Sequence, residues 1–278
     1  MDYPHFKGHQ HINGNDIYYE YYRKDVSVKT LVLIHGFLSS TFSFRRLIPF
    51  LLEEYNILSV DLPPFGNSGK SVQYIYSYEN MAKSIINLTE KLEIGEFVVV
   101  GHSMGGQISL NIANIRPDIV KKAVLLCSSG YLERSKQSLT LLSYLPYFHL
   151  FVKRHLAKSG VLKNLQNVVY NHSLIDEEMF HGYMQPFLQD DIFKGLTRML
   201  RHREGDLPED TLRKIDTPCL LIWGEQDKVV PLHIGKRLHK DLKNSELIIL
   251  KETGHLVPEE RPEEVYSHMK EFIEKSSV

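Results

Sequence analysis

The sequence predicts an α/β fold in which a mostly parallel central sheet has helices on both faces and carries an inserted helical segment. Over the first 130 residues, short apolar runs alternate with longer helical patterns, as they do in parallel-sheet proteins. The alternation stops from Tyr131 to about Leu212, where the chain is helical and rich in Leu, Tyr, Phe and His, and it then resumes. We therefore expect a core domain from residues 1–130 and 213–278, with a helical cap, or lid, from residues 131–212.

Composition is that of an ordinary globular protein. The 278 residues are 42% hydrophobic and 24% charged, which is enough apolar surface to bury a sizeable core. The 33 basic and 34 acidic residues leave a net charge of -1. This balance predicts no nucleic-acid partner and no general attraction to anionic lipid. We expect a small-molecule substrate that is near neutral, whereas the oligomeric state is not readable from the sequence.

The sequence also bears on compartment and anchoring. The N-terminal residues have no basic stretch followed by an apolar run, so no secretory signal is expected and the cytoplasm is the predicted location. The longest apolar stretch, residues 139–152, is broken by Pro146 and His149 and is too short to span a bilayer, so no stable membrane anchor is expected. Cys127 and Cys219 lie in apolar runs and are expected to be buried core thiols.

The elements of the core follow in order along the chain. Asn13-Gly14 is a favoured hairpin turn, so an antiparallel pair is expected first, at the edge of the sheet. Short apolar runs bounded by Gly, Asp or Ser predict parallel strands at 30–34, 55–60, 96–100 and 122–127. Helical patterns between them predict crossovers at 42–54, at 78–92 with Ser77 as N-cap, and at 104–115.

The second half of the chain continues the pattern after the cap. Breaks within the cap are expected at Pro146, Gly160, Gly182 and Pro186. Strands are then expected at 218–223 and 246–250, with a helix at 235–241 between them and a final helix from about residue 262.

A nucleophile motif follows the third core strand. Gly101-His102-Ser103-Met104-Gly105-Gly106 has the pattern G-x-S-x-G, directly after an apolar strand and directly before a helix, which is the context that this motif requires. Small residues at 101 and 105 allow a tight, strained turn that projects the hydroxyl of Ser103 from the carboxyl end of the sheet. We therefore expect Ser103 to be a nucleophile.

A serine hydroxyl needs a base, and the base needs a carboxylate to hold its tautomer. His255 follows Thr253-Gly254 at the end of the last expected strand, and Asp227 follows the strand before it. Both would lie at the same edge of the sheet as Ser103. The predicted triad is Ser103, Asp227 and His255, in a chain order described for one class of hydrolases.

These motifs together resemble those of the α/β-hydrolase superfamily. The resemblance includes His35-Gly36-Phe37, the run from Asp61 to Ser68, the nucleophile motif, WGEQD at 223–227 and the Gly-His pair at 254–255. It covers nearly the whole chain apart from the cap. It implies an oxyanion hole formed by the backbone N–H groups of Phe37 and Met104.

Other residues compete for some of these roles. His35 and His102 lie beside backbone turns and are expected to pack and to form local hydrogen bonds. Glu225 is the alternative acid to Asp227, and Asp61 lies in a run that is typical of a structural loop. No metal-ligand spacing and no phosphate-binding loop are found, so no metal and no cofactor are expected.

The expected function is hydrolysis of a small, apolar ester by a carboxylesterase-like serine hydrolase, with an acyl-enzyme intermediate. Ser103 argues against haloalkane dehalogenases and epoxide hydrolases, which carry aspartate in the similar motif. Carbon–carbon bond hydrolysis stays an alternative, although Leu256 stands where compared members often have Trp. Cofactor-free haloperoxidase or perhydrolase activity is another alternative. A ligand receptor with the same fold and slow turnover is the alternative of a different class.

Overall fold

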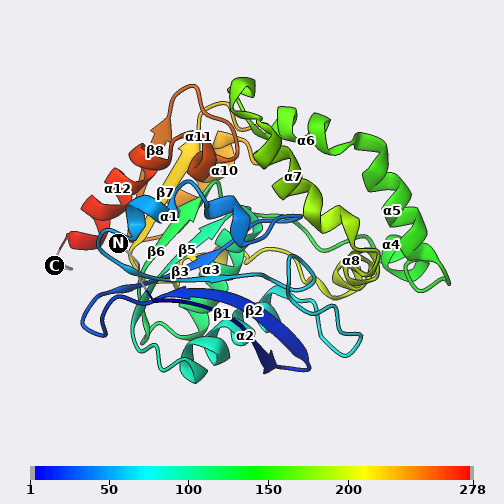
Figure 1. The fold of residues 1–278 in the computed structure, drawn as a ribbon, viewed down its shortest axis with the longest axis horizontal. Coiled ribbons are helices and arrows are strands. Elements are labelled where there is room, and N and C mark those ends of the chain that lie inside the picture. The colour runs from blue at the N-terminus through cyan, green and yellow to red at the C-terminus, as the bar shows by residue number, and fades with distance from the viewer. Residues whose placement is uncertain (1–3, 276–278) are drawn as a thin grey trace.

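The computed structural model describes residues 4–275, apart from the side chains of residues 158 and 159. A single eight-stranded sheet forms its centre (Figure 1), with the order β1-β2-β4-β3-β5-β6-β7-β8. The strands are β1 (His5–Ile12), β2 (Asn15–Tyr22), β3 (Thr30–Ile34), β4 (Asn56–Val60), β5 (Phe97–His102), β6 (Val120–Leu126), β7 (Cys219–Gly224) and β8 (Ser245–Leu250).

The predicted hairpin lies at one edge of this sheet. β1 and β2 pair antiparallel with Ile12 opposite Asn15, which leaves Asn13 and Gly14 as a two-residue turn. Both turn residues have positive φ, 53° and 81°, which is the conformation that Asn-Gly adopts readily. The sequence prediction is therefore confirmed for the turn and for its place at the edge.

The other strands from β3 to β8 are parallel, and their order places the loops of the site. β4 and β5 lie on opposite sides of β3, so the chain reverses its direction of winding at β3. Loops at the carboxyl ends of strands diverge at such a point and leave room for a ligand. The loop after β3 and the turn after β5 are therefore neighbours at the carboxyl edge of the sheet.

Helices cover both faces of the sheet, and their packing follows the sequence pattern. α2 packs against α3, and α1 packs against α12. The core helices are η1 (Thr41–Phe44), α1 (Ile48–Leu51), α2 (Tyr78–Lys91), α3 (Met104–Ile115), α10 (Leu232–Asp241), α11 (Val257–Glu260) and α12 (Pro262–Glu274). The hydroxyl of Ser77 accepts from the N–H of Asn80, so the predicted N-cap is present.

Residues 131–212, here called the helical insertion, connect β6 to β7. Figure 1 shows much of this segment at the side of the molecule away from α12. Its division from the core as a cap domain stays a prediction. Its helices are α4 (Gln137–Leu142), α5 (Phe148–Ser159), α6 (Val161–Val168), η2 (His172–Leu174), α7 (Glu177–Met184), η3 (Gln185–Leu188), α8 (Asp191–His202) and α9 (Glu209–Leu212).

Two predictions about helices were wrong. The helix expected at 42–54 is broken into η1 and α1, and the intervening residues form turns. Pro49 has no N–H to donate to a preceding turn, so it lies in the first turn of a new helix. Gly182 does not break the insertion but lies inside α7. A Cβ at this position would lie 2.1 Å from the ring of Phe42, so only glycine leaves room for that ring.

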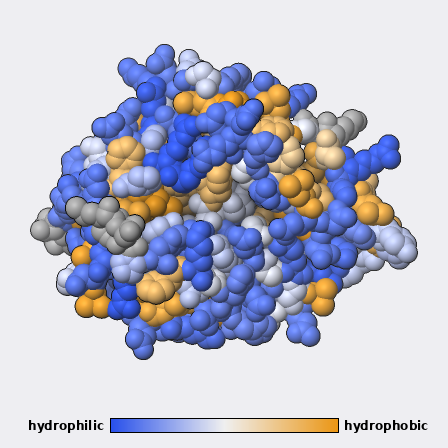
Figure 2. Space-filling view, in the orientation of Figure 1, coloured by the Kyte–Doolittle hydropathy of each residue, from blue (hydrophilic) through white to orange (hydrophobic). Residues whose placement is uncertain are grey.

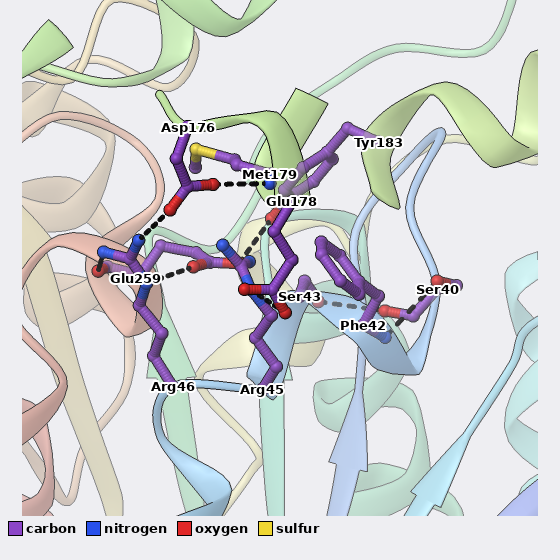
Figure 3. A network of polar contacts seen from close by, with 10 residues as sticks. All are labelled: Ser40, Phe42, Ser43, Arg45, Arg46, Asp176, Glu178, Met179, Tyr183 and Glu259. Carbon is purple, nitrogen blue, oxygen red and sulfur yellow. Dashed lines mark hydrogen bonds and ion pairs between the residues drawn. The ribbon is translucent and has the colours of Figure 1, made fainter. Parts of the chain in front are cut away.

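A buried carboxylate joins the core to the insertion (Figure 3). Glu259 on α11 is fully buried, and its carboxylate contacts the guanidinium groups of Arg45 and Arg46, the latter at 3.5 Å. The hydroxyl of Tyr183 on α7 donates to the same carboxylate at 3.4 Å. One side chain of the core therefore holds both arginines and touches the insertion.

The two arginines extend this network into α7. Arg46 donates to Asp176 at 3.2 Å, and the other oxygen of Asp176 accepts from the N–H of Met179 at 2.7 Å as the N-cap of the helix. Arg45 lies 3.6 Å from Glu178. The N-terminus of α7 is therefore held by ion pairs that centre on Glu259.

No helix in the described part of the chain is both long enough and apolar enough to cross a bilayer.

The buried carboxylate should make stability depend on pH. Burial raises the pKa of Glu259 from 4.5 to about 7, although the charges of Arg45 and Arg46 lower it. The pKa of Glu259 is higher in the folded state than in the unfolded state. The stability that the protonated carboxyl group contributes is therefore fully present below about pH 4.5 and is lost as the pH rises through about 7. Relative to Glu259→Gln, the free energy of unfolding of the wild type should fall by up to about 3 kcal/mol over this range.

Urea unfolding at several pH values measures this difference. Glu178→Gln is the matched control, because Glu178 belongs to the same network but its side chain is 71% exposed. Its stability should run parallel to that of the wild type. Parallel curves for the wild type and Glu259→Gln would contradict the account of Glu259.

Candidate active site

Ser103 lies at a strained turn between β5 and α3. Its φ of 55° and ψ of -119° are unusual for a residue with a side chain. A Cβ at Gly101 would lie 2.3 Å from the carbonyl oxygen of Gly105, and one at Gly105 would lie 2.1 Å from that of Ile34. The absence of these two side chains allows strand and helix to meet closely. Ser103 is thereby held at the carboxyl edge of the sheet, as its motif predicts.

His255 and Asp227 lie together on neighbouring loops. Nδ1 of His255 is 2.7 Å from Oδ2 of Asp227, and both side chains are buried. The other oxygen of Asp227 accepts from the N–H groups of Val229 and Val230 at 2.8 and 2.9 Å. The carboxylate is therefore fixed by three donors, and Nδ1 of His255 carries the proton when the imidazole is neutral. Glu225, the competing acid, is exposed and accepts from Gln226.

The backbone around His255 is bonded to the helical insertion. The N–H of His255 donates to the carbonyl of Val168 at 2.7 Å. The carboxylate of Glu260 accepts from the N–H of Gly254 at 2.9 Å and from that of Tyr170 at 2.8 Å. The end of α6 and the loop that carries His255 are thus joined directly. A shift of the insertion would move the imidazole with it.

A cavity of about 310 Å³ opens beside Ser103 and His255. Its walls come from the loop after β3, from the residues next to His255 and from the insertion, and most of them are apolar. Tyr183, which belongs to the Glu259 network, is part of the wall. The lining includes Phe37, Leu38, Val161, Leu165, Val168, Phe187, Val229 and Leu256. A cavity with walls of this composition suits an apolar group.

A second cavity of about 380 Å³ lies on another side of Ser103. The two cavities share Phe37, Ser103 and Val229, so the serine lies where they meet. The walls of the second cavity include Arg203 at the end of α8 and His233 at the start of α10. Both spaces beside Ser103 are mostly apolar, and the second one also has a guanidinium and an imidazole in its wall.

The two backbone groups expected to form an oxyanion hole lie next to Ser103. Met104 is the first residue of α3, and Phe37 follows Gly36, whose Cβ would lie 3.0 Å from that of Ser103. Neither N–H donates to another described residue. The ring of Phe37 packs edge-on against Phe65, with centroids 5.6 Å apart. Both N–H groups are thus available to a ligand.

The competing histidines and Asp61 have structural partners. His35 donates to the carbonyl of Gly36 at 2.7 Å and accepts from the N–H of Leu62 at 2.9 Å, and burial lowers its pKa to about 4. His102 donates to the carbonyl of His255 at 2.9 Å, and burial lowers its pKa to about 3. Both imidazoles are therefore neutral and hold the backbone in place, but only the bond from His35 to Gly36 is local as predicted, since the partner of His102 lies 153 residues away in the sequence.

Asp61 also has a structural role. Its carboxylate accepts from the N–H groups of Thr41 and Asn67, each at 2.7 Å. Burial raises the pKa of this carboxyl to about 6. Asp61 thus ties the loop after β4 to the loop after β3 and makes no contact with His255.

One group near the site has ligand types that suit a metal ion. Side-chain ligand atoms of Cys127, Asp227 and His255 all lie within 4.8 Å of one another. Burial raises the pKa of the Cys127 thiol well above its ordinary value, so the sulfur stays protonated. Both oxygens of Asp227 are already engaged by the imidazole and two N–H groups. These three residues are therefore better suited to orient the imidazole of His255 than to bind a metal ion.

Sequence reasoning missed the residues that tie the site to the insertion. Glu259, Glu260 and Tyr183 carry no motif, and their partners lie far away in the sequence. The one available signal was the pair of glutamates in the first turn of α11, four and five residues after His255, where acidic residues are common for electrostatic reasons.

Comparison with known proteins identifies the family. A family model described as alpha/beta hydrolase fold matches residues 29–262. The chain is 55% identical over 262 residues to the uncharacterized hydrolase YugF of Bacillus subtilis (strain 168), covering 94% of this chain and 96% of that protein. It is 26% identical over 274 residues to a 2-hydroxy-6-oxononadienedioate/2-hydroxy-6-oxononatrienedioate hydrolase of Burkholderia vietnamiensis, covering 95% and 93%.

A solved structure shows the same fold at lower identity. It is the 2-hydroxy-6-oxo-6-phenylhexa-2,4-dienoate hydrolase from Rhodococcus sp. strain RHA1, with a TM-score of 0.81 and 21% identity over 98% of this chain and 99% of that one. Because the family model spans most of the sequence, and because a relative with more than half of its residues identical covers nearly all of the chain, this protein belongs to the α/β-hydrolase family and is a hydrolase.

Proposed function

We propose that the protein is a serine esterase that hydrolyses small, apolar esters through an acyl-enzyme intermediate. The observation that carries the proposal is the 2.7 Å hydrogen bond between His255 and Asp227 beside Ser103, at the wall of an apolar cavity. A histidine whose Nδ1 is held by a carboxylate presents Nε2 as a base. The strained turn at Ser103 and the free N–H groups of Phe37 and Met104 support the same chemistry.

In the first half-reaction, Nε2 of His255 takes the proton of Ser103 while Oγ attacks the ester carbonyl. Asp227 keeps the Nδ1 proton and stabilises the imidazolium that forms. The N–H groups of Phe37 and Met104 donate to the oxyanion, and each such donor contributes about 3 kcal/mol to transition-state stabilisation. When the tetrahedral intermediate collapses, the C–O bond to the alcohol breaks and His255 gives its proton to the departing alkoxide.

The second half-reaction repeats these steps with water. His255 takes a proton from water, the resulting hydroxide attacks the acyl carbon, and the imidazolium returns its proton to Oγ of Ser103. The free acid leaves and the serine is restored. The apolar cavity suits the acyl chain, because its walls are aliphatic and aromatic side chains.

A second candidate is hydrolysis of a carbon–carbon bond in an acidic substrate. Arg203 and His233 in the second cavity favour it, since both can hold a carboxylate next to Ser103. The relative from Burkholderia vietnamiensis is named for a dienedioate, which is a dicarboxylate. Arg203→Ala discriminates between the two: it should leave the hydrolysis of neutral esters unchanged and should raise KM for a dicarboxylate substrate of this kind.

Ser103 should be indispensable for ester turnover. With p-nitrophenyl esters of increasing chain length, the wild type should turn over repeatedly, with kcat/KM passing through a maximum at short to medium chains that fit the cavity. Ser103→Ala should lose at least roughly a thousandfold in kcat, since the nucleophile is removed. A single turnover that stops with the acyl group bound would instead indicate the slow receptor-like alternative.

Asp227 and Glu225 allow a matched test of the acid. Asp227→Asn keeps the shape but presents an amide to Nδ1, which favours the wrong tautomer, so kcat should fall by roughly 10⁴-fold. Glu225→Gln makes the same change from carboxylate to amide at an exposed residue and should leave kcat within twofold of the wild type. The reverse ranking in a steady-state ester assay would transfer the role to Glu225.

A further inference from the structure

The outer surface of α4 and α5 exposes large apolar side chains. Leu141 is 71% exposed, Tyr144 65%, Tyr147 74% and Phe151 61%. Leu142, Leu145 and Leu150 are also half exposed or more. We call residues 139–151 the outer apolar surface. Figure 1 places α4 and α5 at the end of the molecule opposite α12, and Figure 2 shows orange atoms at that edge, over α5.

These side chains are exposed although α5 packs on the fold and the residues after α4 are bonded to α8. Val152 and Leu156 of α5 pack against the main hydrophobic core, and α5 packs along α8. The guanidinium of Arg201 on α8 donates to the hydroxyl of Ser143 at 2.9 Å and lies 4.3 Å from the centroid of the Tyr144 ring. One side of α5 thus packs on the fold, and the side chains of the outer apolar surface stay exposed.

The turn between α4 and α5 contributes to this arrangement. Tyr147 adopts φ of 62° and ψ of 9°, a left-handed conformation that is uncommon for a residue with a bulky side chain. Backbone strain of this kind persists where the surrounding structure imposes it, and it gathers at functional positions. Here it accompanies the most exposed aromatic ring of the surface.

The charge of the same segment is strongly one-sided. From Arg134 to Ile175 the sequence has six lysine and arginine residues and no aspartate or glutamate. The whole chain has 33 basic and 34 acidic residues, so the rest of it must be acidic. Arg134, Lys136, Arg154 and Lys163 are exposed and form no ion pair with any residue that the structure describes. The near-neutral net charge hides this local excess.

We propose that the outer apolar surface docks reversibly on a bilayer that contains anionic lipids. Leucine, phenylalanine and tyrosine side chains would enter the boundary between headgroups and acyl chains, and the unpaired lysines and arginines would lie against the lipid phosphates. The partner is identified by charge complementarity. A second copy of this chain would bring the same positive charges together, which is unfavourable.

Such docking goes beyond the proposed esterase activity and does not depend on it. No group at Ser103 takes part in the contact. Because α5 leads through Gly160 directly into α6, whose side chains line the apolar cavity, the bound protein would hold that cavity within a few residues of the lipid.

Co-sedimentation with large unilamellar vesicles tests the proposal. The full chain should bind vesicles of phosphatidylcholine with 30% phosphatidylglycerol at least tenfold more strongly than pure phosphatidylcholine vesicles, and 0.5 M NaCl should weaken this binding. Each Lys or Arg near an anionic surface contributes about 1 kcal/mol. Arg154→Gln with Lys163→Gln should therefore lower the partition coefficient by roughly 30-fold. Tyr147→Ser with Phe151→Ser should lower it by at least tenfold.

Matched controls change exposed residues elsewhere in the chain. Phe6→Ser on β1, where Phe6 is 56% exposed, and Lys240→Gln on α10 should bind vesicles as the wild type does. Far-UV circular dichroism and the urea midpoint should be the same for all variants, because every changed side chain is exposed. Ser103→Ala should bind vesicles normally, so failure of docking and failure of the esterase proposal are separate results.

Three results would overturn the proposal. One is equal binding to neutral and anionic vesicles, and another is unchanged binding by both double variants. The third is a dimer in analytical ultracentrifugation that Tyr147→Ser with Phe151→Ser abolishes while vesicle binding by the wild type is absent, since the surface would then be covered by a second copy.

Discussion

The hydrogen bond between His255 and Asp227 is the interaction on which the site depends. A buried imidazole has two tautomers, and only the one with a proton on Nδ1 leaves Nε2 free as a base. Asp227 can impose that tautomer because its second oxygen is held by the N–H groups of Val229 and Val230. Asp227 lies in the loop after β7 and His255 in the loop after β8. The parallel pairing of these two strands therefore brings Nδ1 of His255 to 2.7 Å from Oδ2 of Asp227.

The helical insertion is part of this frame as well as a cover over it. The carbonyl of Val168 accepts from the N–H of His255, and Glu260 bridges the same loop to the residues after α6. Glu259, which precedes Glu260 in the chain, holds the start of α7 through two arginines. The segment that lines the apolar cavity therefore also holds the loop that carries His255. Changes in the insertion should affect the rate as well as the affinity.

Much of this could be predicted from the sequence, because the relevant signals are local. The strained turn at Ser103 requires small residues at fixed offsets, and the hairpin at Asn13-Gly14 requires positive φ, so both leave a mark in the sequence. Two features differ from the prediction. The expected helix at 42–54 is interrupted before Pro49, and α7 continues through Gly182. In the second case the glycine serves a contact with Phe42, which is 140 residues away in the sequence and leaves no local signal.

Long-range pairing explains the remaining gap. The roles of Glu259, Glu260 and Tyr183 depend on where the insertion meets the core, which no local pattern in the sequence indicates.

The proposal that Ser103 is the nucleophile is tested most directly by labelling with a fluorophosphonate, followed by mapping of the adduct by mass spectrometry. The account predicts one phosphonyl group per chain, on the peptide that contains Ser103, and slower labelling of Asp227→Asn. A folded wild-type protein that does not label, or that labels at another serine, would contradict the account.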